Sequence, residues 1–258
     1  MPTIPIIFED DALLVINKPA PLLVHGLHGR IKNHELGMKN YQEPTVVDWL
    51  LYQEPQIAKL VWPEPSRPGI VHRLDRDTSG VMVIAKNPEV LNQLQQQFQS
   101  RTVQKTYQAL VVGEPTWEEQ TVRAPISRSD GTRRTANFFI PPDKPSKPAE
   151  TFFRVLKRYF LQPVTYNLQP GLCLVEAQPK TGRTNQIRVH LQLLGHPILG
   201  DPWYETKQST ALAKKLDVPR LMLHANQLSF VHPQTGEKLT FEAPIPKDIQ
   251  TIIETLGN

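Results

Sequence analysis

A single carboxylate stands between two arginines in the stretch 72–80, which reads His-Arg-Leu-Asp-Arg-Asp-Thr-Ser-Gly. Asp75 lies between Arg73 and Arg76, and a neighbouring positive charge favours the ionised form of a carboxyl group. An ionised carboxylate can act as a nucleophile or a base, and the two arginines would attract an anionic polymer. The stretch therefore suggests both a chemistry and a class of substrate.

The same stretch is also favourable turn chemistry. Asp and Ser side chains hydrogen-bond nearby backbone N–H groups, and Gly80 permits a positive φ. Taken alone, the local sequence favours a structural turn over a catalytic one. Only the rest of the chain can change that balance.

A second unusual stretch, 181–191, reads Thr-Gly-Arg-Thr-Asn-Gln-Ile-Arg-Val-His-Leu. It predicts a helix with Thr184 as its N-cap. The free N–H groups of a helix N-terminus, together with Arg183, would form a phosphate site. Arg188 lies off the apolar stripe of this helix, so its guanidinium can pair with a carboxylate, although an arginine in such a position is more often only exposed.

Size and composition set broad limits. The 258 residues can bury a substantial core, as one large domain or two small ones. A net charge of +4 is too small for a tail that wraps nucleic acid, but it allows a basic cleft. The single cysteine excludes an intrachain disulfide and fits a reducing compartment. No apolar run reaches the length of a membrane span, and the N-terminus has no signal pattern, so we expect a cytoplasmic protein.

Strand and helix patterns intermix without a regular βαβ rhythm, which favours an α+β fold around a mixed sheet. The predicted strands lie within 4–18 (a hairpin), 70–86, 106–112, 150–178 and 221–231. The predicted helices begin at Thr45, after the N-cap Asn87 and after the N-cap Thr184, and two more cover 211–216 and 245–256.

Seven motifs together resemble the RluA class of RNA pseudouridine synthases. In chain order they occupy 10–19, 69–86, 105–113, 147–156, 181–191, 195–201 and 220–225. One such motif would be a weak signal, but seven in the order of the family leave little room for coincidence. The resemblance covers roughly residues 6–245 and implies an α+β fold with a mixed, largely antiparallel central sheet, flanked by helices and loops, with a catalytic cleft across the sheet.

The resemblance also implies an activity: the isomerisation of specific uridines in ribosomal or transfer RNA to pseudouridine. It implies that Asp75 is the catalytic aspartate and Tyr107 the active-site tyrosine. Arg188 corresponds to the arginine that pairs with the aspartate, and Arg73 to a residue that helps to displace the target base.

The remaining expectations concern substrate binding and organisation. Arg76, Lys180 and Arg183 would hold RNA phosphates. The reaction adds and removes no group, so no cofactor and no metal is expected. We expect residues 1–258 to form one catalytic domain without a separate N-terminal RNA-binding domain, acting as a monomer. Substrate choice would then depend on the loops at 25–44 and 128–148.

Two positions depart from the pattern of the family. Asn185 stands where the family usually has histidine, which makes an essential acid–base role there doubtful. Pro21 stands where the family usually has glycine. Two other functions remain open: a catalytically inactive RNA-binding module, and a glycoside hydrolase, which would need a second carboxylate such as Asp77.

Overall fold

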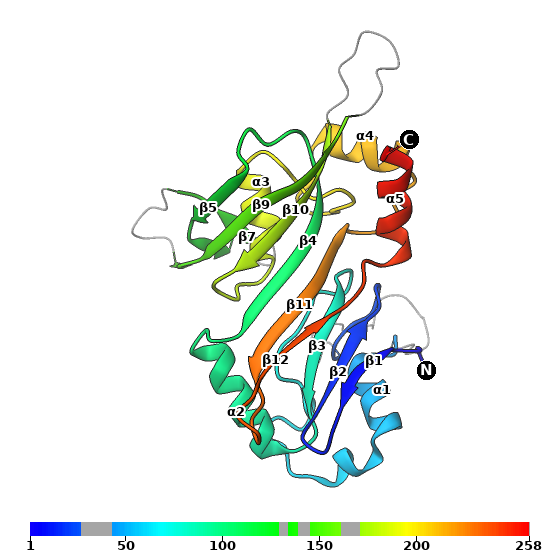
Figure 1. Cartoon of the computed structure of the whole chain (residues 1–258), viewed down its shortest axis with the longest axis vertical. Coiled ribbons are helices and arrows are strands. Elements are labelled where there is room, and N and C mark those ends of the chain that lie inside the picture. The colour runs from blue at the N-terminus through cyan, green and yellow to red at the C-terminus, as the bar shows by residue number, and fades with distance from the viewer. Residues whose placement is uncertain (27–42, 129–133, 139–144, 161–170, 258) are drawn as a thin grey trace, which may run out of the picture. The chain divides into compact units, whose positions relative to one another are not determined.

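A computed structural model describes residues 1–26, 43–128, 134–138, 145–160 and 171–257 (Figure 1). The chain divides into two compact units. Unit 1 comprises Met1–Val103 and Ser229–Ala243, and unit 2 comprises Gln104–Leu228 and Pro244–Asn258. The strand β11 (Leu223–Val231) contributes residues to both.

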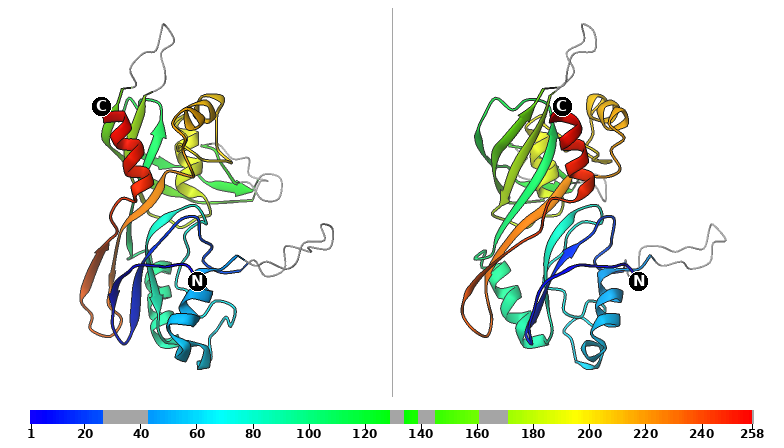
Figure 2. Two further views of the ribbon diagram at one scale, coloured as in Figure 1. Left: turned by 90° about the vertical axis from the view of Figure 1, so that its right-hand side faces the viewer. Right: turned by 45° about the vertical axis from the view of Figure 1, so that its right-hand side comes forward.

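Unit 1 is built on an antiparallel sheet in the order β1-β2-β3. Its remaining elements are α1, a 3₁₀ helix η1, α2 and β12, which pairs with β11. The bounds are β1 Ile6–Glu9, β2 Leu13–Lys18, α1 Val46–Gln53, η1 Pro55–Lys59, β3 Ser79–Ala85, α2 Pro88–Gln99 and β12 Lys238–Glu242. Every residue of β3 is buried, and α2 packs against it. Figures 1 and 2 show the N-terminus beside α1.

Both helix starts predicted in this unit are confirmed. Thr45 caps α1 in a reciprocal box with Asp48: its hydroxyl accepts from the Asp48 N–H, and the Asp48 carboxylate accepts from the Thr45 N–H. Asn87 caps α2 by accepting from the Val90 N–H at 2.9 Å, and Pro88 occupies the first helical position. The predicted hairpin at 4–18 is β1 and β2.

Unit 2 contains an antiparallel sheet in the order β4-β10-β9-β5, a small sheet in the order β7-β6-β8, and three helices. The bounds are β4 Gln104–Val112, β5 Glu119–Arg123, β6 Ile126–Arg128, β7 Arg134–Ala136, β8 Ser146–Lys147, β9 Glu150–Tyr159, β10 Leu172–Pro179, α3 Gln186–Leu193, α4 Lys207–Lys215 and α5 Lys247–Gly257. Apolar residues of all three helices join those of β4 and β10 in one buried cluster. The pairs β4-β10, β10-β9 and β9-β5 are antiparallel, in agreement with the predicted largely antiparallel sheet.

Two helix starts in unit 2 differ from the prediction. Thr184 is not the N-cap of α3: the cap is Asn185, whose backbone is left-handed with φ +57°. Asparagine tolerates this conformation better than most residues, so the chain turns there and the helix starts one residue later. The helix predicted at 211–216 begins earlier, at Lys207, because Thr206 and Ser209 form a capping box.

His190 is a structural residue of unit 2. Its side chain is fully buried. Its Nε2 donates to the Ala124 carbonyl at 3.0 Å, so Nδ1 of the neutral ring accepts from the Thr151 hydroxyl at 2.9 Å. Burial lowers the pKa of His190, and the hydrogen bond to Ala124 only partly offsets this effect.

This lowered pKa predicts a loss of stability in mild acid. Between the folded-state pKa and the unfolded value of about 6.5, the unfolded chain binds more protons than the folded chain. The free energy of unfolding should therefore fall as pH decreases through that window. His190→Gln retains a donor and an acceptor without a titrating ring, so urea unfolding from pH 8 to pH 5 should show a shallower dependence. Parallel curves for the two proteins would show that His190 does not contribute.

Candidate active site

Asp75 lies in a hydrogen-bonded turn at the entrance to β3. Its carbonyl accepts from the Thr78 N–H at 3.1 Å, which closes a turn through Arg76 and Asp77. The turn continues directly into the buried β3, while the Asp75 side chain is half-buried. The predicted turn is thus present, and it holds the carboxylate at the end of a rigid element.

The buried side chain of Lys18 holds this turn through hydrogen bonds to backbone carbonyls. Its side chain is fully buried, and its ammonium donates to the carbonyls of Pro19 (2.9 Å), Leu22 (2.8 Å) and Arg76 (3.2 Å). The Leu22 N–H also donates to the Arg76 carbonyl at 2.9 Å. A buried ammonium is tolerated only where it is well hydrogen-bonded, so the loop after β2 and the Asp75 turn are joined at one point. Sequence reasoning assigned no such role to Lys18.

His72 holds the chain on the other side of the turn. Its Nε2 accepts from the Val83 N–H of β3 at 3.2 Å, and its ring stacks on Phe98 of α2, with centroids 4.6 Å apart. The segment 71–75 lies beside β3 but is not a strand, so of the strands predicted within 70–86 only β3 forms. Together with Lys18, this contact leaves little backbone freedom at Asp75.

The two arginines next to Asp75 are exposed. Arg73 Nη1 donates to His25 Nε2 at 3.2 Å. Burial lowers the pKa of His25, and the charge of Arg73 adds to the effect. Arg76 makes a bidentate contact with Glu43, with N···O distances of 3.1 to 3.3 Å. To hold a phosphate, Arg76 would have to exchange Glu43 for it.

Tyr107 lies on β4, opposite Ala177 of β10, and its half-buried side chain packs against the apolar cluster of unit 2. Lys105 is two residues earlier and therefore faces the same side of the strand. Burial lowers the pKa of Lys105. Its Nζ is close to Gly182, because a Cβ added to that glycine would lie 3.9 Å from it. The sequence placed Lys105 in a motif without giving it a role.

Arg188 is buried, with a relative exposure of 7%, and pairs with Asp201. Its Nε and Nη2 each contact one carboxylate oxygen at 2.7 Å. The Asp201 carboxylate also accepts from the N–H groups of Trp203 and Tyr204. A guanidinium carries five N–H donors, so the pair with Asp201 does not exclude the predicted pair with Asp75. Asp201 was missed at the sequence level, although it ends the sixth motif.

The glycine before Asp201 is required by its surroundings. Gly200 has φ +75°, and a Cβ added to it would lie 2.0 Å from the Arg220 carbonyl oxygen. No other residue fits there without moving the backbone. The motif at 195–201 therefore places the carboxylate that holds Arg188.

Asn185, the departure from the family pattern, stabilises the same arginine. Its Oδ1 accepts from Arg188 Nη1 at 3.3 Å, and its Nδ2 donates to the Tyr204 hydroxyl at 3.2 Å. The Arg188 guanidinium also lies 5.1 Å from the centre of the Tyr204 ring. Asn185 is thus a neutral hydrogen-bonding residue in this protein.

Gln186 anchors the loop that carries Lys180 and Arg183. Its Oε1 accepts from the Thr181 hydroxyl at 2.6 Å and from the Arg183 N–H at 3.0 Å. Its Nε2 donates to the Glu150 carbonyl and to the Thr151 hydroxyl, both at 2.9 Å. The loop is thereby fixed to β9.

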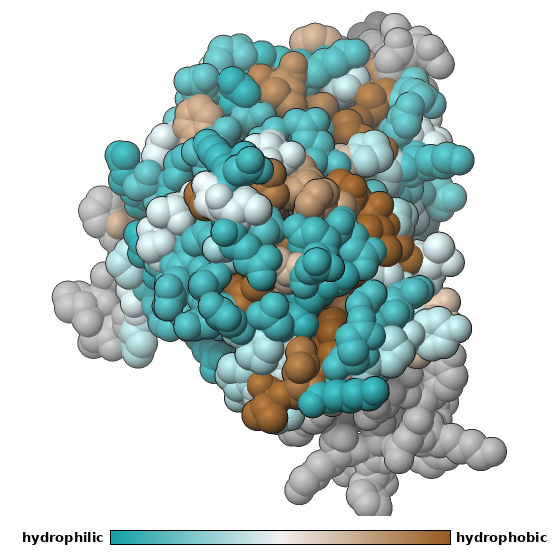
Figure 3. Space-filling view, turned by 60° about the horizontal axis from the view of Figure 1, so that its bottom comes forward, coloured by the Kyte–Doolittle hydropathy of each residue, from teal (hydrophilic) through white to brown (hydrophobic). Residues whose placement is uncertain are grey.

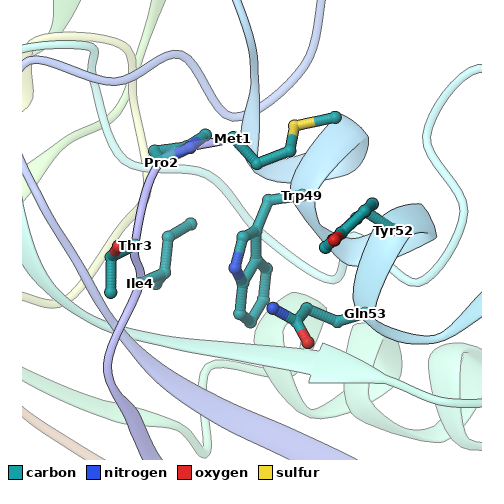
Figure 4. A pocket seen from close by; sticks show the side chains of 7 residues that line it. All are labelled: Met1, Pro2, Thr3, Ile4, Trp49, Tyr52 and Gln53. Carbon is teal, nitrogen blue, oxygen red and sulfur yellow. The ribbon is translucent and has the colours of Figure 1, made fainter.

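A hollow beside the N-terminus of unit 1 offers no such chemistry. Residues 1–4 line it together with Trp49, Tyr52 and Gln53 of α1 (Figure 4). It includes none of the predicted site residues and no acidic or basic side chain.

The predicted site residues fall into two groups. The structure brings Arg73, Asp75 and Arg76 together in unit 1, and it holds Tyr107, Lys180, Arg183 and Arg188 in unit 2.

The described residues contain no group of three or more His, Cys, Asp or Glu side chains that could hold a metal ion. Among the described helices, none is long and apolar enough to cross a membrane. Figure 3 shows a mainly hydrophilic face with hydrophobic residues in narrow strips.

A sequence model of the family described as RNA pseudouridylate synthase matches residues 12–193. The chain belongs to this family. The predicted family and enzyme class are thereby confirmed, and the chain is an RNA-modifying isomerase by family.

Named relatives agree with this assignment. The chain is 37% identical to an RNA pseudouridine synthase of Synechocystis described as uncharacterised, over 96% of this chain and 67% of that protein. It is 38% identical to ribosomal large subunit pseudouridine synthase D of Nitrosomonas europaea, over 98% of this chain and 65% of that protein. It therefore spans about two thirds of the length of these relatives. The solved structure of human RNA Pseudouridylate Synthase Domain Containing 4 matches with a TM-score of 0.69 and 28% identity, over 98% of this chain and 93% of that chain.

Lys18→Met should both destabilise the protein and slow the reaction. Removal of the ammonium takes a donor from the carbonyls of Pro19 and Leu22, at a cost on the order of 1–3 kcal/mol each, whereas the Arg76 carbonyl keeps the Leu22 N–H. We expect the free energy of unfolding in urea to fall by about 2–4 kcal/mol, and kcat to fall more than KM rises, because Asp75 loses its fixed position.

Lys86→Met is the matched control. Its ammonium lies in the same unit but pairs with the carboxylates of Glu9 and Glu54 rather than with carbonyls of the Asp75 turn. If Lys18→Met behaves like Lys86→Met in both assays, Lys18 does not position the turn.

Proposed function

We propose that this chain converts uridines of large-subunit ribosomal RNA to pseudouridine, with Asp75 as the catalytic carboxylate. The observation that carries the proposal is the half-buried Asp75, held in a turn fixed by Lys18 and His72 within the region that matches the family. The ribosomal substrate is suggested by relatives named for the large ribosomal subunit. Such a substrate would place the protein in the cytoplasm.

The reaction requires an ionised Asp75. The N–C glycosidic bond of the uridine breaks, the uracil rotates, C5 bonds to C1′, and C5 then loses its proton. N1, which is no longer bonded to the sugar, takes up a proton from water in place of the proton lost from C5. The atoms therefore balance without a cofactor. The carboxylate either attacks C1′ and is later displaced, or removes a proton from the sugar to give a glycal; both routes begin with the charged form.

Arg188 and Tyr107 complete the proposed chemistry. The Arg188 guanidinium would favour the charged form of Asp75 and orient it. Asp201 and Asn185 restrict the positions that this guanidinium can take. Tyr107 would stack on the uracil and assist removal of the C5 proton.

The target base must leave its stack to reach the carboxylate, at a cost of a few kcal/mol. Arg73 is exposed on the edge of the Asp75 turn, and a guanidinium plane can stack on bases in the vacated place. Lys180 and Arg183 would hold backbone phosphates, and so would Arg76 once it leaves Glu43.

Asp75→Asn should abolish catalysis and keep RNA binding. The amide is nearly the same size but can neither attack C1′ nor accept a proton. With RNA tritiated at C5 of uridine, wild type should release tritium to water, whereas Asp75→Asn should release none above background. Both proteins should bind the RNA with similar affinity.

Asp77→Asn provides the control for this loss of charge. Asp77 is a turn residue two positions away, and its variant should keep activity within a few-fold of wild type. Tritium release by Asp75→Asn at the wild-type rate would end the proposed mechanism. No release by wild type on any RNA would favour an inactive RNA-binding module.

Tyr107→Phe tests the role of the hydroxyl. The phenyl ring keeps the stacking surface, so RNA affinity should stay unchanged. A lost proton-transfer group typically costs about 10²–10⁴-fold in rate, so single-turnover tritium release should slow by at least about 10²-fold. A rate within twofold of wild type would show that the hydroxyl takes no part in proton removal.

A further inference from the structure

Unit 2 contains a hollow of about 440 Å³ beside the loop that leads into α3. The small sheet β7-β6-β8 forms one side and residues 182–184 form the other. Its described lining carries four cationic side chains and no carboxylate: Arg128, Arg134, Lys147 and Arg183. The hydroxyl residues Ser127, Ser146 and Thr184 also belong to the lining.

The arginines of this hollow differ from the others of unit 2. Each of the other described arginines of the unit pairs with a carboxylate: Arg123 with Glu150, Arg154 with Glu176, Arg158 with Glu118, Arg188 with Asp201 and Arg220 with Asp248. Within the described ranges, Arg128, Arg134 and Arg183 make no ion pair. Positive charge that the fold does not neutralise is therefore concentrated in one place.

Two of these arginines are directly opposite each other. Arg128 of β6 and Arg134 of β7 are paired in the antiparallel register, so their side chains share one face of the small sheet. Like charges at directly opposed positions destabilise a strand pair. An arrangement that opposes folding and has no internal compensation is typical of a functional site. A bound anion would supply this compensation.

The small sheet is tied to the element that carries Arg188. The Arg134 N–H donates to the Tyr204 hydroxyl at 3.1 Å, and Asn185 Nδ2 donates to the same oxygen at 3.2 Å. Arg183 Nε donates to the Pro148 carbonyl at 3.1 Å, which places its guanidinium beside β8. A ligand in the hollow would thus be held in a fixed position relative to α3.

We propose that this hollow binds backbone phosphates of the substrate RNA, at nucleotides flanking the target uridine. The inference rests on the proposed function and adds a binding site to it. A guanidinium can donate two parallel N–H hydrogen bonds to two oxygens of one phosphate. The described lining offers no aromatic ring on which a base could stack, so the site binds the backbone and positions the strand rather than reading its sequence.

The test compares two double variants with the same change in charge. Arg128→Gln/Arg134→Gln removes the opposed pair, and Arg123→Gln/Arg154→Gln removes two exposed arginines that pair with glutamates outside the hollow. Affinity for an unmodified large-subunit ribosomal RNA transcript is measured from 50 to 300 mM KCl for wild type and both variants. Thermal unfolding is followed on the same samples.

The hollow variant should bind at least about tenfold more weakly at the lowest salt concentration. The slope of log K against log [KCl] should become shallower by about 0.7 for each lost contact to a single strand. Its unfolding midpoint should equal or exceed that of wild type, because the repulsion between the arginines is removed. The control variant should keep the wild-type slope.

Two results would overturn the proposal: a hollow variant with the affinity and salt slope of wild type, or equal losses in both double variants. A lower unfolding midpoint for the hollow variant would also count against it, because the arginines would then be structural. Wild-type tritium release, assayed in parallel, separates the two proposals. Its absence would sink the proposed function, while the binding data alone would still decide whether the hollow holds RNA.

Discussion

The fully buried ammonium of Lys18 is the contact on which the position of Asp75 depends. It draws together carbonyls from the loop after β2 and from the turn that holds the carboxylate. A buried ammonium that loses a hydrogen bond costs free energy. Movement of the turn would break the bond from Lys18 to the Arg76 carbonyl, and this cost keeps the turn in place. Catalytic geometry requires such rigidity, since a carboxylate displaced by about 1 Å can lose on the order of 10²-fold in rate. In the proposed mechanism, the turn positions the reactive carboxylate.

The guanidinium of Arg188 is restrained in a comparable way within unit 2. Both carboxylate oxygens of Asp201 accept hydrogen bonds from it, and so does the Asn185 side chain at the start of α3. The Tyr204 ring packs beside it. An arginine already paired with one carboxylate has lost most of its rotamer entropy, so it can orient a second carboxylate at little further cost. Asn185 restrains the Arg188 guanidinium as a neutral side chain. Its left-handed backbone also sets where α3 begins. Asn185 thus supports Arg188 without a titrating group.

Local signals in the sequence predicted much of the fold. The helix start at Thr45 and the cap at Asn87 were predicted correctly, because the signals of a helix N-terminus lie within a few residues of one another. Contacts between distant segments left no such signal. Lys18 meets the Arg76 carbonyl across 58 positions, and the opposition of Arg128 and Arg134 depends on strand register. The motifs identified the family, but which side chains hold one another became visible only in three dimensions.

The central claim is that Asp75 acts directly on the sugar of an extruded uridine. The most direct measurement is a crystal structure of the Asp75→Asn protein bound to unmodified substrate RNA, in which the reaction is stopped before the glycosidic bond breaks. The account predicts a uridine outside its stack, with the side-chain oxygen of residue 75 about 3–3.5 Å from C1′ or from the C2′ proton that a glycal route would remove. Tyr107 should lie against the uracil. A uridine bound with its sugar far from residue 75, and another carboxylate at C1′, would contradict it.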